Sequence, residues 1–236
     1  MAILFWWLVR DDPPGRRTAP KAAETPSQIW RGQLEVWRTP GLWRLLAMHV
    51  FGYACMLTVL GVWAGPYLFD VHGLDGVARG NVLLGMGLAQ IVGLLVFGPL
   101  DRIFGSRKKI VVASAALSIV VFGALALLSR PPLALTVALL MAIPFLSSYS
   151  IVIVAQGRAL FTDAQAGRGV TTVNMAQVVG AALLPALTGY LVGAFVHAPG
   201  ATAPEAAYRA VFGLLAAGTA LGLAVYSRAG ATRPPR

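Results

Sequence analysis

The chain has 236 residues, of which 57% are hydrophobic and only 12% are charged, and its mean hydropathy is +0.72. A soluble domain carries about 25% charged residues, so this composition excludes an ordinary water-soluble protein and indicates a polytopic membrane protein. The formal net charge of +10 is interpreted as the Lys and Arg bias that orients membrane helices, and not as a nucleic-acid-binding surface. One cysteine and three scattered histidines predict no disulfide framework and no metal site, and we expect no cofactor.

The first 41 residues precede the long apolar segments. Residues 1–9, MAILFWWLV, are too few to cross a hydrocarbon core of about 30 Å as a helix. A short interfacial anchor is one interpretation; we favour the end of a truncated transmembrane helix whose beginning is missing. Residues 10–41 form a basic linker, expected to be cytoplasmic, in which Trp30, Leu34 and Trp37 recur at amphipathic-helix spacing. Such a helix suits the headgroup level, and a linker with chance spacing is the alternative.

Six apolar segments follow, each long enough to cross a bilayer as a helix. Their expected bounds are near residues 42–68, 81–100, 109–129, 131–155, 170–196 and 208–227. The sequence therefore predicts an all-α integral membrane fold with a six-helix transmembrane domain over residues 42–228. A short cytoplasmic tail is expected over 229–236.

The distribution of Lys and Arg predicts the topology. If the linker is cytoplasmic, sixteen of the nineteen cations lie on the cytoplasmic side, and only Arg79, Arg130 and Arg209 lie on the other. Because cytoplasmic segments carry the excess of Lys and Arg, we expect both termini in the cytoplasm and an even number of crossings.

Glycines at four-residue spacing recur inside the expected spans. This spacing lets helix backbones approach closely, although it also arises by chance in a chain with 26 glycines. The pairs are Gly61 with Gly65, Gly189 with Gly193, and Gly218 with Gly222.

The central parts of the spans carry polar but uncharged side chains, and no Asp, Glu, Lys or Arg. Buried polar groups must face protein or water and not lipid, so their concentration in the first, second, fourth and fifth spans predicts a cavity between these helices. The alternative is that each one only joins neighbouring helices. The candidates for contact with a solute are His49, Tyr53, Gln90, Ser147, Ser150, Asn174 and Gln177.

Helical spacing in the first span predicts one continuous polar and aromatic face. This face joins His49 and Tyr53 to Met56, Leu60, Trp63 and Tyr67, and Leu57 is expected on the opposite side. Without a carboxylate in the spans of this chain, proton coupling would depend on His49 or on residues elsewhere. No metalloprotease, nucleophile-elbow or phosphate-loop motif is present in the sequence, so we do not expect an enzyme.

The segment GPLDRIFGSRKK, residues 98–109, lies between the second and third spans. Its glycines suit a tight turn, and its charged groups suit ion pairs that favour one of two helix packings. Topology signalling alone is the alternative, although that would need only the cations. The residues concerned are Gly98, Asp101, Arg102, Gly105, Arg107, Lys108 and Lys109.

Six spans, a long basic segment before them and this motif after the second span resemble the C-terminal half of a major facilitator superfamily transporter. VWAGPYL at 62–68 and AGRGVTTVN at 166–174 are similar to bacterial members. The motif departs from the family pattern, because Asp101 falls one position early and Ser106 stands where a basic residue is expected. Such degeneracy fits the second half of a transporter. It argues against a role for this motif in locking one conformation.

The resemblance implies half of a secondary active transporter that moves a small solute by alternating access. It also implies two partners besides the solute: the lipid bilayer and a missing N-terminal six-helix half, in the same gene product or a separate chain. A bacterial inner membrane is the expected location. A non-transporting membrane scaffold or partner subunit is the alternative function.

Overall fold

The structure is a computed structural model that describes residues 25–196 and 202–228. The segment 1–9, most of the linker and the tail 229–236 lie outside the described residues, as does the side chain of Asp101. The chain divides into two compact units, residues 1–35 and 36–236. The described part of the first unit holds the beginning of helix α2 (Pro26–Trp37), in which Trp30 is 71% exposed.

The second unit contains six helical segments that are long and apolar enough to cross a membrane. Two of them are interrupted, and within residues 25–196 and 202–228 there is no strand. The expected all-α six-helix bundle is confirmed. Its elements are α3 (Leu42–Thr58), η1 (Val59–Trp63), α4 (Ala64–Asp70), α5 (Gly76–Phe104), α6 (Arg107–Leu127), α7 (Leu133–Ser147), α8 (Ser150–Arg158), α9 (Ala166–Gly193) and α10 (Glu205–Ser227).

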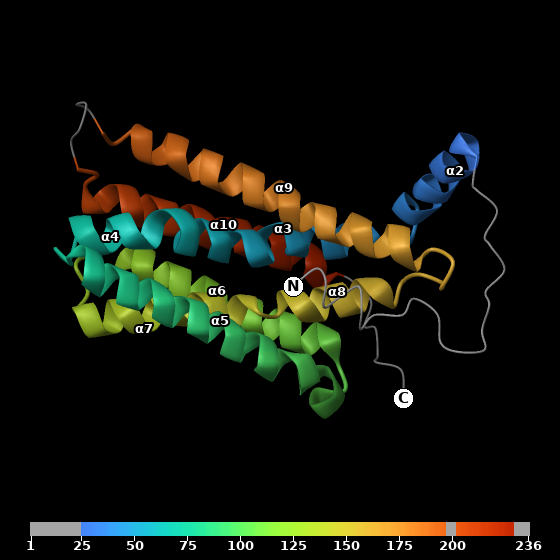
Figure 1. Cartoon of the computed structure of the whole chain (residues 1–236), viewed down its shortest axis with the longest axis horizontal. Coiled ribbons are helices and arrows are strands. Elements are labelled where there is room, and N and C mark those ends of the chain that lie inside the picture. Colours follow the sequence, from blue (N-terminus) through green and yellow to red (C-terminus); the bar gives the residue numbers. More distant parts are fainter. Residues whose placement is uncertain (1–24, 197–201, 229–236) are drawn as a thin grey trace, which may run out of the picture. The chain divides into compact units, whose positions relative to one another are not determined.

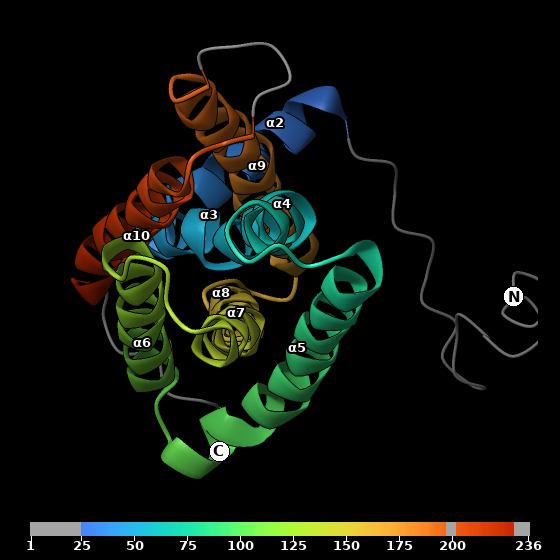
Figure 2. The same cartoon turned by 90° about the vertical axis from the view of Figure 1, so that its left-hand side faces the viewer.

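The helices of this unit are arranged around the crossing formed by α7 and α8. Figure 2 shows α7 between α5 and α6, and these neighbours pack against it. α10 packs between α6 and α3, and α9 packs along α3 and also contacts α10 (Figure 1). The continuation α8 contacts α3, α5, α6 and α9, so residues near the start of α8 are placed at the centre of the unit.

The first crossing contains a π-helical turn, η1, between α3 and α4. A π-helical turn holds more residues than an α-helical one, so it changes which face the following residues occupy. The indole N–H of Trp63 donates to Thr188 Oγ1 of α9 at 2.8 Å, and Tyr67 packs against Tyr208 and Phe212 of α10. The expectation of one continuous face from His49 to Tyr67 is therefore wrong, because that expectation assumed an uninterrupted α-helix.

The fourth crossing is broken between α7 and α8. Pro144 has no N–H to donate to the preceding turn, and α7 ends three residues later at Ser147. The hydroxyl of Ser148 donates to the carbonyl of Pro144 at 3.1 Å and also lies 3.4 Å from the carbonyl of Gln90 in α5. A Cβ atom at Gly93 would lie 2.3 Å from Ser148 Oγ, so α5 approaches the break closely.

Glycine lets α9 and α10 approach α3 closely, although only one of the predicted pairs takes part. Added Cβ atoms at Gly218 and Gly222 would lie within 3.0 Å of the Phe51 ring, whereas Gly61, Gly189 and Gly193 face open space. The closest approach involves Gly180, where a Cβ would lie 2.0 Å from the carbonyl oxygen of Val50. Spacing alone did not identify this position.

Candidate solute cavity

A cavity of about 340 Å³ lies between α3, η1, α5, α8 and α9. These are the first, second, fourth and fifth crossings, whose polar residues predicted a cavity. The lining side chains are Tyr53, Met56, Leu57, Leu60, Gly87, Gln90, Leu94, Ser150, Ile151, Val154 and Gln177.

Four polar side chains line the cavity, and each comes from a different helix. They are Tyr53 of α3, Gln90 of α5, Ser150 of α8 and Gln177 of α9. Among the described residues, the buried Oε1 of Gln90 has no hydrogen-bond partner. A buried amide oxygen without a partner is costly, so a hydrogen bond from water or a bound solute that reached it would be favourable.

The described lining residues carry no charge, and most of them are apolar. A wall of this kind, with a few uncharged donors and acceptors, is typical of a site for a small molecule. It offers hydroxyl and amide groups to a solute but no fixed counter-ion. Such a wall can orient a small molecule by hydrogen bonds and contact it over apolar surface.

The other three candidates do not line this cavity. His49 is fully buried one turn before Tyr53, and neither ring nitrogen has a hydrogen-bond partner among the described residues. Ser147 is buried at the end of α7, and Asn174 is exposed on α9. Residues of one polar cluster thus lie on opposite sides of the break between α7 and α8: Ser150 lines the cavity, and Ser147 does not.

Sequence reasoning missed much of the apolar lining. Leu57 lines the cavity, so its expected place on the opposite side of the helix is wrong. Leu94, Ile151 and Val154 carry no distinguishing signal in a chain rich in such residues. Gly87 has open space where a Cβ would stand, which leaves room in the cavity.

The motif at 98–109 is mostly helical and is not an open loop. Gly98 lies inside α5, with open space where a Cβ would stand, so its expected role in turning the chain is wrong. Gly105 alone makes the turn, at φ +60°, and Ser106 then caps α6 by accepting a hydrogen bond from the backbone N–H of Lys109 at 3.4 Å. A positive φ strains any residue with a side chain, which explains glycine at position 105.

The cations after this turn connect α6 to the end of α10. Lys108 Nζ donates to the carbonyl of Ser227 at 2.6 Å, and Arg44 of α3 donates to the carbonyl of Arg228 at 2.7 Å. Both cations lie at the C-terminus of α10, where they satisfy carbonyls that have no partner within the helix. Arg107 is buried, and Arg102 is exposed near the end of α5.

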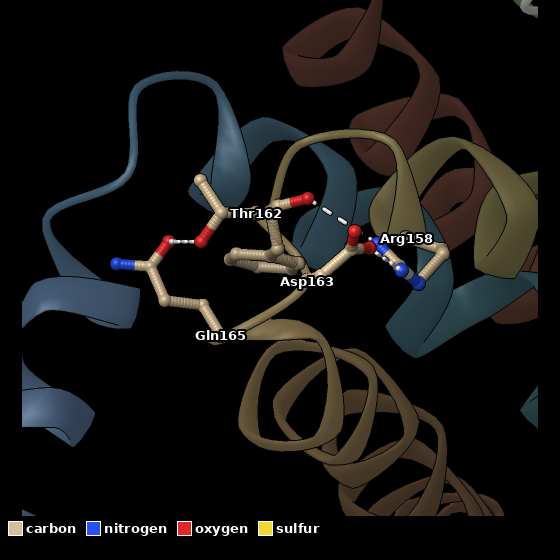
Figure 3. A network of polar contacts seen from close by, with 5 residues as sticks. Arg158, Thr162, Asp163 and Gln165 are labelled. Atoms are coloured by element: carbon tan, nitrogen blue, oxygen red, sulfur yellow. Dashed lines mark hydrogen bonds and ion pairs between the residues drawn. The ribbon is translucent and has the colours of Figure 1, made fainter. Parts of the chain in front are cut away.

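A second polar cluster holds the turn between α8 and α9 (Figure 3). Arg158 Nη2 donates to Asp163 Oδ1 at 2.6 Å, and its Nη1 donates to the carbonyl of Phe161 at 3.2 Å. Thr162 Oγ1 lies 3.3 Å from Gln165 Oε1, just before α9 begins. This turn fixes where α9 starts, and hence where Gln177 meets the cavity.

Six membrane-crossing helical segments around an uncharged polar cavity define the class: a polytopic membrane protein with a site of solute size. The family model described as Major Facilitator Superfamily matches residues 1–155 and 80–236, which together cover the whole chain. The chain belongs to this superfamily, whose members are membrane transporters and not enzymes. No curated protein matches the chain.

Proposed function

We propose that the cavity between α3, α5, α8 and α9 binds a small uncharged or weakly polar solute during transport across the membrane. The observation that carries this proposal is the convergence of four polar side chains from four helices on one cavity, with the Gln90 amide oxygen left without a partner among the described residues. The solute would accept or donate hydrogen bonds to Tyr53, Gln90, Ser150 and Gln177.

The mechanism we propose is alternating access by secondary transport. In the superfamily to which the chain belongs, two six-helix halves enclose one path, and one rocks against the other about a central site. These six helices would act as one half, paired with a second six-helix unit in the same gene product or in another chain. The cavity would then face that unit.

The proposed setting is a bacterial inner membrane, with the Lys- and Arg-rich ends of the helices in the cytoplasm. Support for this orientation comes from the cation distribution. The second candidate function is a membrane scaffold or partner subunit that does not transport. In that case the polar residues would serve packing only.

Cysteine accessibility tests the proposal without knowledge of the solute. In a Cys55→Ala background, Gln90→Cys should react with a membrane-impermeant thiol reagent, because a solute path admits water and a thiolate forms only where water reaches it. Leu88→Cys is the matched control, since Leu88 is on the same helix and its side chain is 55% exposed on the outside of the helix bundle. We expect Leu88→Cys to react much more slowly.

The side of reaction separates the two candidate functions. Labelling Gln90→Cys in intact cells and in inverted vesicles should succeed from both sides if access alternates. Reaction from one side only would contradict alternating access and favour the scaffold. Equal rates for Gln90→Cys and Leu88→Cys would contradict a water-filled cavity altogether.

A further inference from the structure

A second hollow, of about 330 Å³, lies between the end of α5 and the beginning of α6. It is distinct from the solute cavity, because the two share no lining residue. Its lining side chains are Phe97, Leu100, Phe104, Lys109, Ile110, Ala113 and Ser114.

The groove is apolar along its length and carries a cation at one end. Lys109 stands in the first turn of α6, while Ala113 and Ser114 lie further along the same helix. Five residues of helix rise about 7.5 Å, so the charge and the inner apolar wall are separated along the membrane normal. This polarity matches a molecule with an anionic head and an apolar tail.

The first turn of α6 carries positive charge, which the dipole of the same helix disfavours. Arg107, Lys108 and Lys109 are its first three residues, and no acidic residue accompanies them. Cations at a helix N-terminus are unfavourable, because the helix dipole is positive there. The carbonyl of Ser227 accepts from Lys108, but among the described residues no carboxylate lies within ion-pair distance of the exposed Lys109.

We propose that this groove binds one anionic glycerophospholipid of the surrounding membrane. The lipid phosphate lies against the ammonium of Lys109, with exposed Arg102 on the neighbouring helix end adding positive potential. One acyl chain lies along Phe97, Leu100 and Ala113. The proposal needs only that the chain spans a membrane, so it stands apart from the proposed transport of a solute.

Native mass spectrometry of the detergent-purified full chain tests the site. The probes are phosphatidylglycerol and phosphatidylcholine with identical acyl chains, added separately. We expect one tightly bound phosphatidylglycerol and weaker binding of phosphatidylcholine. Lys109→Gln should weaken phosphatidylglycerol binding about fivefold, which corresponds to the attraction of one basic residue for an anionic membrane surface. Arg38→Gln, an exposed cation outside the groove, should leave binding unchanged.

A second pair of variants tests the apolar wall. Ala113→Phe should fill the groove and lower the affinity for both lipids, whereas Ala116→Phe, exposed one turn further along α6, should not. Equal effects of Lys109→Gln and Arg38→Gln, or of the two Phe variants, would overturn the proposal. A lipid-free dimer that Ala113→Phe abolishes would also overturn it, because the occupant would then be a second copy. Unchanged circular dichroism confirms that each variant is folded.

Discussion

At the scale of single residues, the polar side chains of the spans separate into those that join helices and those that face the cavity. Tyr226 donates to Gln156 Oε1 at 2.5 Å, and the Tyr208 hydroxyl donates to Asp70, so these groups are satisfied within the protein. Gln90 Oε1 has no such partner among the described residues. Hydrogen-bond partners thus distinguish residues that have the same polarity in the sequence.

The sequence alone does not distinguish the polar residues that join helices from those that face the cavity. The sequence singled out Tyr53, Gln90, Ser150 and Gln177 because uncharged polar groups are rare in apolar spans, and all four line one cavity. It singled out Asn174 by the same criterion, although this residue is exposed on α9. Which polar residue points inward depends on the rotation of each helix, and a weakly amphipathic span does not encode that rotation.

His72, between α4 and α5, predicts a pH-dependent stability. Its Nε2 lies 3.1 Å from Thr136 Oγ1; burial lowers the pKa of His72 below its ordinary value, and the Glu205 carboxylate opposes that shift. The folded state therefore binds the proton more weakly than the unfolded chain does. Stability from this residue is fully present above the unfolded-state pKa of about 6.5 and is lost as pH falls from there through the lower folded-state pKa.

Thermal unfolding in detergent at pH 7.5 and pH 5.5 measures this effect. The wild-type protein should lose more stability on acidification than His72→Gln, which keeps a polar partner for Thr136 but does not titrate. An identical loss in both proteins would contradict a role for His72.

At the scale of helices, packing depends on where a backbone reaches another backbone. α9 meets α3 at Gly180, where a Cβ would overlap the carbonyl oxygen of Val50 and lie 2.8 Å from Ala54 Cβ. A backbone atom cannot move aside as a flexible side chain can. Both α3 and α9 line the cavity. Their close spacing therefore requires that residue 180 have no side chain.

Gly180→Ala should separate these helices and destabilise the protein by about 1–3 kcal/mol, as overpacking does. Gly189→Ala is the matched control on the same helix, because open space surrounds that position. It should be neutral or should stabilise by up to about 1 kcal/mol through helix propensity. Unfolding in detergent by a denaturant series measures both, and similar values for the two variants would contradict the close contact.

Helix positions were predictable, but their interruptions were less so. Long apolar runs locate the spans because a bilayer demands about twenty apolar residues. Pro144 lies just before the break after α7, where proline removes a backbone hydrogen bond. Nothing in Val59–Trp63 signals a π-helical turn, and the contacts of Trp63 with α9 and α10 cannot be read from the sequence.

At the scale of the whole molecule, the cation distribution predicts one orientation in the membrane. Lys108 and Arg44 lie together at the C-terminal end of α10, whereas Arg130 lies at its N-terminal end beside Glu205, 3.7 Å away. The more basic end should be cytoplasmic.

Reporter fusions in bacterial cells test this orientation. A green fluorescent protein fused after Arg236 should fluoresce, and alkaline phosphatase fused at the same place should be inactive. Fusions after Arg130 should give the opposite pair of results, because three of the described crossings lie between the linker and this position. Active phosphatase after Arg236 would reverse the proposed topology.

The π-helical turn also sets the phase between the two ends of the first crossing. Removing one residue from a continuous α-helix shortens it by about 1.5 Å and rotates everything beyond by about 100°. A π-helical turn holds an extra residue, so one residue removed within Val59–Trp63 would convert that turn to an α-helical one instead of rotating the far end. Tyr53 and Met56 before the turn would then keep their places on the cavity wall, while Tyr67 beyond it would keep its packing against α10.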